Sequence, residues 1–134
     1  MIKILNFTLL FLYCLFIYWL SNQPSLPVPQ MFSSQDKILH AGAYFIMGIL
    51  ASRSFKYLFN KPSILALFSI TFCSLYGISD EWHQSFVEGR FSDIADWAAD
   101  TSGAGLAVFI MHKLRWQQVD NAGQDTARKS TQYR

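Results

Sequence analysis

Four apolar runs of similar length alternate with short polar segments along the chain. They cover residues 4–20, 38–55, 63–79 and 94–111. Each run is slightly shorter than the roughly 20 apolar residues that a membrane-spanning helix needs, and flanking residues can lengthen it. The first and third runs carry no charged residue, whereas the fourth carries two aspartates. The pattern therefore predicts four membrane-spanning helices.

The polar segments between the runs contain residues that end or begin helices. Residues 21–36 hold three of the four prolines, and Pro62 stands at a position suited to the first turn of a helix. Residues 113–134 are polar and lack apolar periodicity, which predicts a mostly disordered cytoplasmic tail. We therefore predict an all-α, polytopic integral membrane protein with a membrane domain over residues 1–112, folded as a compact bundle of transmembrane helices. The predicted helices are about residues 4–20, 37–55, 63–80 and 93–112.

The first run has one property of a signal peptide, because Lys3 precedes an apolar stretch. The residues that follow, Ser21 to Pro24, lack the small-x-small pattern of a cleavage site. We therefore expect this run to stay in the mature chain as a membrane anchor.

The composition also indicates a membrane protein. The chain is 51% hydrophobic and 15% charged, whereas soluble domains carry about 25% charged residues. The net charge is only +2 and the basic residues are scattered, which argues against a nucleic-acid partner and leaves the lipid bilayer as the predicted partner. Cys14 and Cys73 lie inside apolar runs, so we predict buried thiols that pack as small apolar side chains.

The basic residues predict the orientation of the chain. Of the eleven Lys and Arg residues, all but Lys37 and Arg90 lie before the first run, between the second and third runs, or after the fourth. Positively charged flanks of membrane helices stay in the cytoplasm. We therefore predict a multi-pass protein of the cytoplasmic (inner) membrane with both termini in the cytoplasm, and residues 21–37 and 80–93 face outward.

Polar side chains share one face at the outward end of three predicted helices. Asp36 and His40 are four residues apart on the second helix, and Asp96 and Asp100 are four apart on the fourth. Lipid cannot solvate such groups, so these faces should turn toward one another. The predicted functional cluster consists of Asp36, Lys37, His40, Asp80, Glu81, His83, Gln84, Arg90, Asp96 and Asp100.

Structural roles explain only some of these carboxylates. Asp36 and Asp93 lie at helix starts, where a carboxylate is stabilised by about 0.3–1 kcal/mol. Asp80 and Glu81 end the third helix, where the helix dipole disfavours negative charge, so they need a basic side chain or a metal ion as a partner. Asp100 lies deeper in the membrane, at a cost of about 2.5–3.5 kcal/mol. We therefore expect a functional use for Asp80, Glu81, Asp96 and Asp100 as a group.

Three motifs resemble the VanZ-like family of bacterial membrane proteins. They are DKILHAGAY at residues 36–44, SDEWHQSFVEGR at residues 79–90 and DIADWAADTSGAG at residues 93–105. That family is named for a protein associated with teicoplanin resistance. The resemblance implies a four-helix protein of the bacterial cytoplasmic membrane, and it supplies no reaction.

Small residues of the last motif are expected to bring helices close together. Gly103 and Gly105 have the size that such packing requires. The chain departs from the family pattern at two positions: Glu88 stands where a Pro is common, and Ala107 stands where a second Gly is common.

Three functions are consistent with these features. The first is an envelope protein whose outward-facing acidic and His site binds or alters a cell-wall or lipid-linked ligand, in relation to glycopeptide resistance. The second is a membrane-embedded, metal-dependent hydrolase or transferase, with His40, Glu81 and Asp96 as candidate ligands of a divalent cation. The third is a proton- or ion-coupled transporter with Asp96 and Asp100 as relay groups. The sequence contains neither G-x-S-x-G nor H-E-x-x-H, so it identifies no catalytic residue and leaves the enzymatic activity, the metal and the oligomeric state open.

Overall fold

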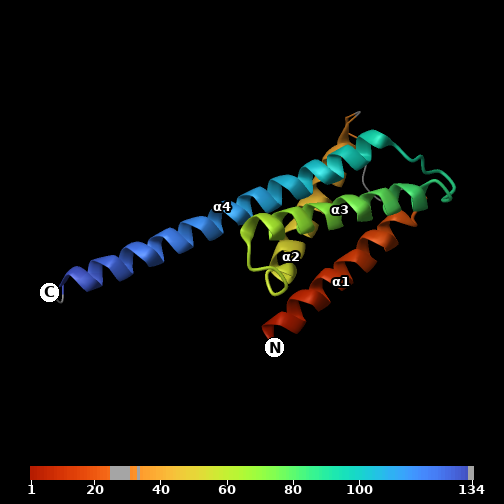
Figure 1. Cartoon of the computed structure of the whole chain (residues 1–134). Helices are drawn as coiled ribbons and strands as arrows, with labels where there is room; N and C mark the ends of the chain where they lie inside the picture. Colours follow the sequence, from red (N-terminus) through yellow and green to blue (C-terminus); the bar gives the residue numbers. More distant parts are fainter. Residues whose placement is uncertain (25–30, 33, 133–134) are drawn as a thin grey trace.

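The part of the chain that the structure describes folds into four helices (Figure 1). The computed structural model describes the backbone of residues 1–24, 31–32 and 34–132, and the side chains of these residues up to residue 115. The described residues contain no β-strand, so the predicted all-α fold is confirmed. In chain order the helices are α1 (Ile2–Ser21), α2 (Gln35–Phe55), α3 (Pro62–Gln84) and α4 (Ile94–Gln132).

Three of these helices, α1, α2 and α3, are long and apolar enough to cross a membrane. They expose large apolar side chains, such as Leu12 on α1 and Leu67 on α3, which is the surface expected of helices in contact with lipid. α4 is less apolar because Asp96 and Asp100 interrupt its first half. The protein is therefore a multi-pass membrane protein by the length and composition of three helices.

Local sequence signals set the helix ends. Pro62 begins α3 and follows Lys61, whose backbone is extended. Gly89, in the turn after α3, has a φ of 83°, a conformation that glycine adopts without strain. Asp93 precedes α4, and its Oδ1 accepts a hydrogen bond from the N–H of Ala95 at 2.8 Å, which caps the helix. The boundaries of α1, α2 and α3 and the start of α4 lie within a few residues of the predicted ones.

The C-terminal segment differs from its prediction. We expected residues 113–134 to be mostly disordered, whereas α4 continues as a helix to Gln132 and extends past the other three helices (Figure 1). The physical reason is that this segment contains no proline and only one glycine, and many of its residues favour helix even without an apolar face. The division into a membrane domain over residues 1–112 and a cytoplasmic tail stays a prediction.

The most extensive helix contact joins α2 and α4, which run side by side in the same direction. A Cβ on Gly48 would lie 2.8 Å from the carbonyl oxygen of Ala104, and a Cβ on Gly103 would overlap the carbonyl oxygen of Ala41. Both glycines therefore allow the two backbones to approach closely. A Cβ on Gly105 would meet no atom within 4 Å, so of the two glycines expected to serve packing only Gly103 does so.

Hydrogen bonds to backbone carbonyls join α1 to α2 and α3. The hydroxyl of Tyr13 donates to the carbonyl of Ala43 at 2.9 Å, and the hydroxyl of Tyr76 donates to the carbonyl of Cys14 at 2.6 Å. Both cysteines are free thiols; Cys73 is buried as predicted, whereas Cys14 is half-buried. α1 thus covers one side of α2 and α3.

Candidate metal centre

Four helix ends meet at one end of the protein, which we call the acidic end. α1 and α3 finish there, and α2 and α4 begin there (Figure 1). All of the nine Asp and Glu residues except Asp120 and Asp125 belong to these helix ends or to the loop between α3 and α4. We call the other end, where α1 and α3 begin and α2 finishes, the opposite end.

Lys37 binds the carboxylates at the start of α4. Its Nζ lies 2.9 Å from Asp93 Oδ2, 2.9 Å from Asp96 Oδ1 and 3.7 Å from Asp36 Oδ2. The N–H of Ala95 and, second, the ammonium of Lys37 hold the pKa of Asp93 below its ordinary value. Asp36, Asp93 and Asp96 therefore have basic or backbone partners within the protein.

Four other residues form a separate group, which we call the His40 cluster. Each residue offers one ligand atom, and these four atoms all lie within 4.8 Å of one another. His40 Nδ1 lies 2.9 Å from Asp100 Oδ1 and 4.0 Å from Glu81 Oε1. The carboxylates are buried, with Glu81 5% and Asp100 0% exposed. The members of the cluster are His40, Asp80, Glu81 and Asp100.

Two carboxylate oxygens of the His40 cluster have no hydrogen-bond partner. Glu81 Oε2 accepts from the backbone N–H of Asp93 at 2.8 Å, but Glu81 Oε1 is buried without a partner. Asp100 Oδ1 contacts His40, but Asp100 Oδ2 is likewise buried and unpartnered. A buried polar atom without a partner is costly, and a buried charge without one is more so.

A divalent cation would satisfy these atoms. Three buried carboxylates repel one another, and a single imidazole supplies at most one positive charge. Carboxylate oxygens suit Mg²⁺, Ca²⁺ and Mn²⁺, and an imidazole nitrogen adds affinity for Zn²⁺ and Fe²⁺. The mixed ligand set of the His40 cluster therefore fits a cation such as Mn²⁺ or Zn²⁺ best.

Asp96 lies outside the His40 cluster, although the sequence singled it out as a candidate metal ligand. It stands one helical turn before Asp100 on α4, where the ammonium of Lys37 reaches it. Asp80 and Asp100 complete the set instead. The carboxylate that meets His40 depends on how α2 is staggered against α4, which no local signal in the sequence reveals.

Arg90 acts on the His40 cluster through Gln84. Its Nε and Nη2 donate to Gln84 Oε1 at 3.1 Å and 2.8 Å, and Gln84 Nε2 donates to Asp80 Oδ2 at 3.2 Å. Arg90 thereby orients the amide so that its NH₂ group faces the carboxylate. These hydrogen bonds of Arg90 go to an amide rather than to a carboxylate.

His83 faces away from the His40 cluster, although it was expected to belong to the same group. Its ring packs against Tyr18 of α1, with the centroids 4.6 Å apart. It therefore lies on the side of α3 that α1 covers.

Three cavities have a member of the His40 cluster in their walls, and two of them are described here. One of about 280 Å³ lies between α1, α2 and α3, with His40 and Asp80 in its wall. Its other wall residues include the aliphatic side chains of Ile17 and Leu20 from α1, which the sequence did not mark because they resemble any other lipid-facing residue. A second cavity, of about 330 Å³, has Glu81 in its wall. The His40 cluster is therefore buried, and cavities lie directly beside it.

A comparison with known families identifies the family of this chain. The family model described as VanZ/LLP1 matches residues 3–115, which is most of the chain. The chain belongs to the VanZ-like family. Neither the comparison with curated proteins nor the comparison with solved structures found a match.

In this VanZ-like protein, the three motifs noted in the sequence supply the whole His40 cluster. The first motif contributes His40, the second contributes Asp80 and Glu81, and the third contributes Asp100. The VanZ/LLP1 match ends at residue 115, so the rest of α4 lies beyond it. The residues that carry the family resemblance are therefore those that meet at the acidic end.

Proposed function

We propose that this VanZ-like protein binds a divalent cation in the His40 cluster and uses it to hold and hydrolyse the phosphate of a lipid-linked ligand of the cell envelope. The observation that carries the proposal is the gathering of one imidazole and three buried carboxylates within 4.8 Å, from three different helices. Two buried carboxylate oxygens without partners support a cation at this position.

The chemistry of such a site favours a phosphate ester. A divalent cation held by His40, Asp80, Glu81 and Asp100 would polarise a phosphoryl oxygen and lower the pKa of a nearby water. The oxygen of that water would bond to phosphorus, and the bond between phosphorus and the lipid oxygen would break. The proton that the water gives up would end on the leaving lipid alcohol, and phosphate would be released.

The cavity beside the cluster supports a lipid-linked ligand. Its walls combine Ile17, Leu20 and Leu39 with His40 and Arg90. An apolar chain fits among the aliphatic side chains, while an anionic head lies beside the cluster and the guanidinium. Amphipathic ligands of this kind are available to a protein whose helices lie in a membrane.

The acidic end is proposed to face outward, with α4 as a fourth spanning helix in the cytoplasmic membrane. Single cysteines at Glu88 and at Asn60, in a chain whose Cys14 and Cys73 are replaced by alanine, test this orientation. Both positions are exposed, Glu88 at the acidic end and Asn60 at the opposite end. An impermeant maleimide on intact cells is expected to label the cysteine at 88 and to spare the one at 60 until the cells are permeabilised. The reverse pattern would overturn the orientation.

Metal and lipid assays on the purified protein test the function. After treatment with EDTA, addition of Mn²⁺ or Zn²⁺ is expected to raise the melting temperature by several degrees, because the cation binds the folded protein only. Release of phosphate from an isoprenyl phosphate, or from phosphatidic acid, is expected to require the same cation. A Mn²⁺ or Zn²⁺ response with lipid binding and no phosphate release would retain the site and reject hydrolysis.

The same preparation separates proton-coupled transport from this proposal. Proton flux in proteoliposomes that is unaffected by EDTA, in a protein whose melting temperature ignores divalent cations, would favour the transporter. The buried carboxylates of α4 would then serve as relay groups.

A further inference from the structure

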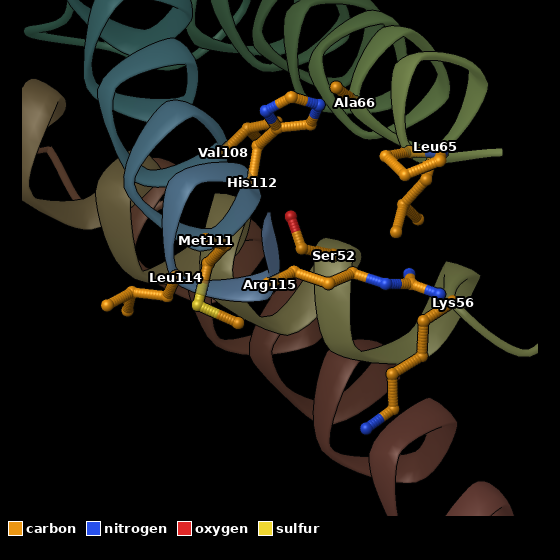
Figure 2. A pocket seen from close by; sticks show the side chains of 10 residues that line it. Ser52, Lys56, Leu65, Ala66, Val108, Met111, His112, Leu114 and Arg115 are labelled. Atoms are coloured by element: carbon orange, nitrogen blue, oxygen red, sulfur yellow. The ribbon is translucent and has the colours of Figure 1, made fainter. Parts of the chain in front are cut away.

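Another cavity, with basic rather than acidic side chains in its wall, lies at the opposite end of the protein. Its volume is about 380 Å³, and it lies between the end of α2, the start of α3 and the middle of α4 (Figure 2). It is distant from the His40 cluster, since α2 and α4 both begin at the acidic end and run to this one. The residues of the wall that matter here are Ser52, Lys56, Leu65, Val108, Met111 and Arg115.

The polar side chains of this cavity are two cations, a serine hydroxyl and the imidazole of His112. Figure 2 shows Ser52 and Arg115 beside the same space, with the hydroxyl of Ser52 directed into it, whereas Lys56 lines the cavity with its ammonium directed away from Ser52. Ser52 is 5% exposed, and its Oγ has no hydrogen-bond partner. Its hydroxyl is therefore available to hydrogen-bond a ligand in the cavity.

The cations of the cavity lack a counter-charge within the described residues. No Asp or Glu lines the cavity. Among the side chains up to residue 115, neither Lys56 nor Arg115 forms an ion pair, and the described Asp and Glu side chains belong to the acidic end. Lys56 lies over the ring of Tyr57 at 5.1 Å, which leaves its ammonium open to an anion. The cavity therefore suits an anionic ligand.

The apolar part of the wall indicates which anion. Leu65, Val108 and Met111 line the same cavity. The cavity also lies at the depth where α2 ends and α3 begins, which is the level of lipid headgroups for helices that span a membrane. Basic pockets between membrane helices bind the phosphates of anionic lipids, and a guanidinium pairs with a phosphate through two parallel hydrogen bonds.

We infer that this cavity binds the headgroup of an anionic phospholipid, with its phosphate against Ser52 and Arg115 and an acyl chain along Leu65 and Met111. The site is separate from the proposed metal centre, and its ligand is a structural or regulatory lipid rather than a substrate.

Lipid titration of the full-length protein in nanodiscs of phosphatidylcholine tests the inference. Phosphatidylglycerol is expected to raise the melting temperature in a saturable manner, whereas more phosphatidylcholine has no effect. Arg115→Gln is expected to weaken the apparent affinity for phosphatidylglycerol roughly tenfold or more, because a charge-assisted hydrogen bond is lost. Ser52→Ala, which leaves the fold intact because it removes an unpartnered atom, is expected to weaken it roughly fivefold.

Two controls make the result specific. Arg53→Gln removes a positive charge from an exposed position of α2 that does not line the cavity, and its affinity is expected to match the wild type. Asp100→Asn, at the metal centre, is expected to keep the lipid response, so that failure of one proposal is distinguishable from failure of the other. Equal loss in Arg53→Gln and Arg115→Gln would overturn the inference, as would a saturable response to inorganic phosphate alone.

Discussion

Asp100→Asn is expected to abolish the stabilisation of the protein by Mn²⁺ or Zn²⁺ while leaving the metal-free protein as stable as the wild type or more stable. Asp100 is fully buried, and one of its oxygens has no partner. Replacing a destabilised buried carboxylate with an amide of the same shape removes an uncompensated charge, so the metal-free fold should not suffer. The cation, however, loses a ligand at the centre of the His40 cluster.

The size of the effect follows from the role of a direct ligand. Loss of a residue that only supports a metal ligand already costs about 10–100-fold in affinity, so loss of the ligand itself is expected to exceed roughly 100-fold. Isothermal titration and melting temperature, measured on protein treated with EDTA, report both quantities. Glu81→Gln is expected to behave in the same way, because Glu81 Oε1 is the other unpartnered oxygen.

Asp93→Asn is the matched control for these variants. It makes the same chemical change at an exposed carboxylate that caps α4 and pairs with Lys37. Asn caps helices about as well as Asp does, and Lys37 keeps Asp96 as a partner. The metal response of this variant is expected to equal that of the wild type. If Asp100→Asn also kept the full response, the His40 cluster would have only a structural role.

Gly103→Ala is expected to destabilise the protein by about 3 kcal/mol. Its added Cβ would overlap the carbonyl oxygen of Ala41, which belongs to the backbone of α2 and cannot rotate aside. Overpacking of this kind costs about 1–3 kcal/mol and sometimes more, because whole helices must separate. His40 directly precedes Ala41, and Asp100 stands three residues before Gly103, so the separation should also weaken metal binding.

Gly105→Ala, two residues further along α4, is expected not to destabilise the protein. A Cβ at this position would meet no atom within 4 Å, so the substitution adds helix propensity without a clash. Its stability is expected to equal or slightly exceed that of the wild type. Unfolding in mixed detergent micelles, followed by circular dichroism, compares the two variants. Equal stabilities for both would show that α2 and α4 are not held at the distance described here.

The sequence predicted the helices and the end at which the polar residues gather. Apolar runs identify membrane helices directly, and the four-residue spacing of Asp96 and Asp100 places them on one face whatever the partner helix is. The sequence did not predict which acid meets Lys37 and which meets His40. That choice depends on the stagger of α2 and α4, and the contact between Gly103 and Ala41 fixes it through residues far apart in the chain.

Two further features of the structure were not predicted from the sequence, and each has a local cause. The sequence did not reveal that Gln84 joins Arg90 to Asp80 through hydrogen bonds. The helical continuation of α4 was not expected because residues 113–134 lack the apolar periodicity of an amphipathic helix. Lys113 and the residues that follow favour helix through intrinsic propensity instead.

The origin of the His40 cluster from three helices bears on how the protein is synthesised. α3 leaves the ribosome before α4, so Asp80 and Glu81 exist for a time without Asp100, Lys37-bound Asp96 or the cap residue Asp93. Carboxylates in that state resist burial in lipid. The His40 cluster is therefore complete only after the first two turns of α4 have been synthesised. A chain truncated before Asp100 is expected to leave Asp80 and Glu81 without the α4 member of the cluster, and so to bind no divalent cation at this position.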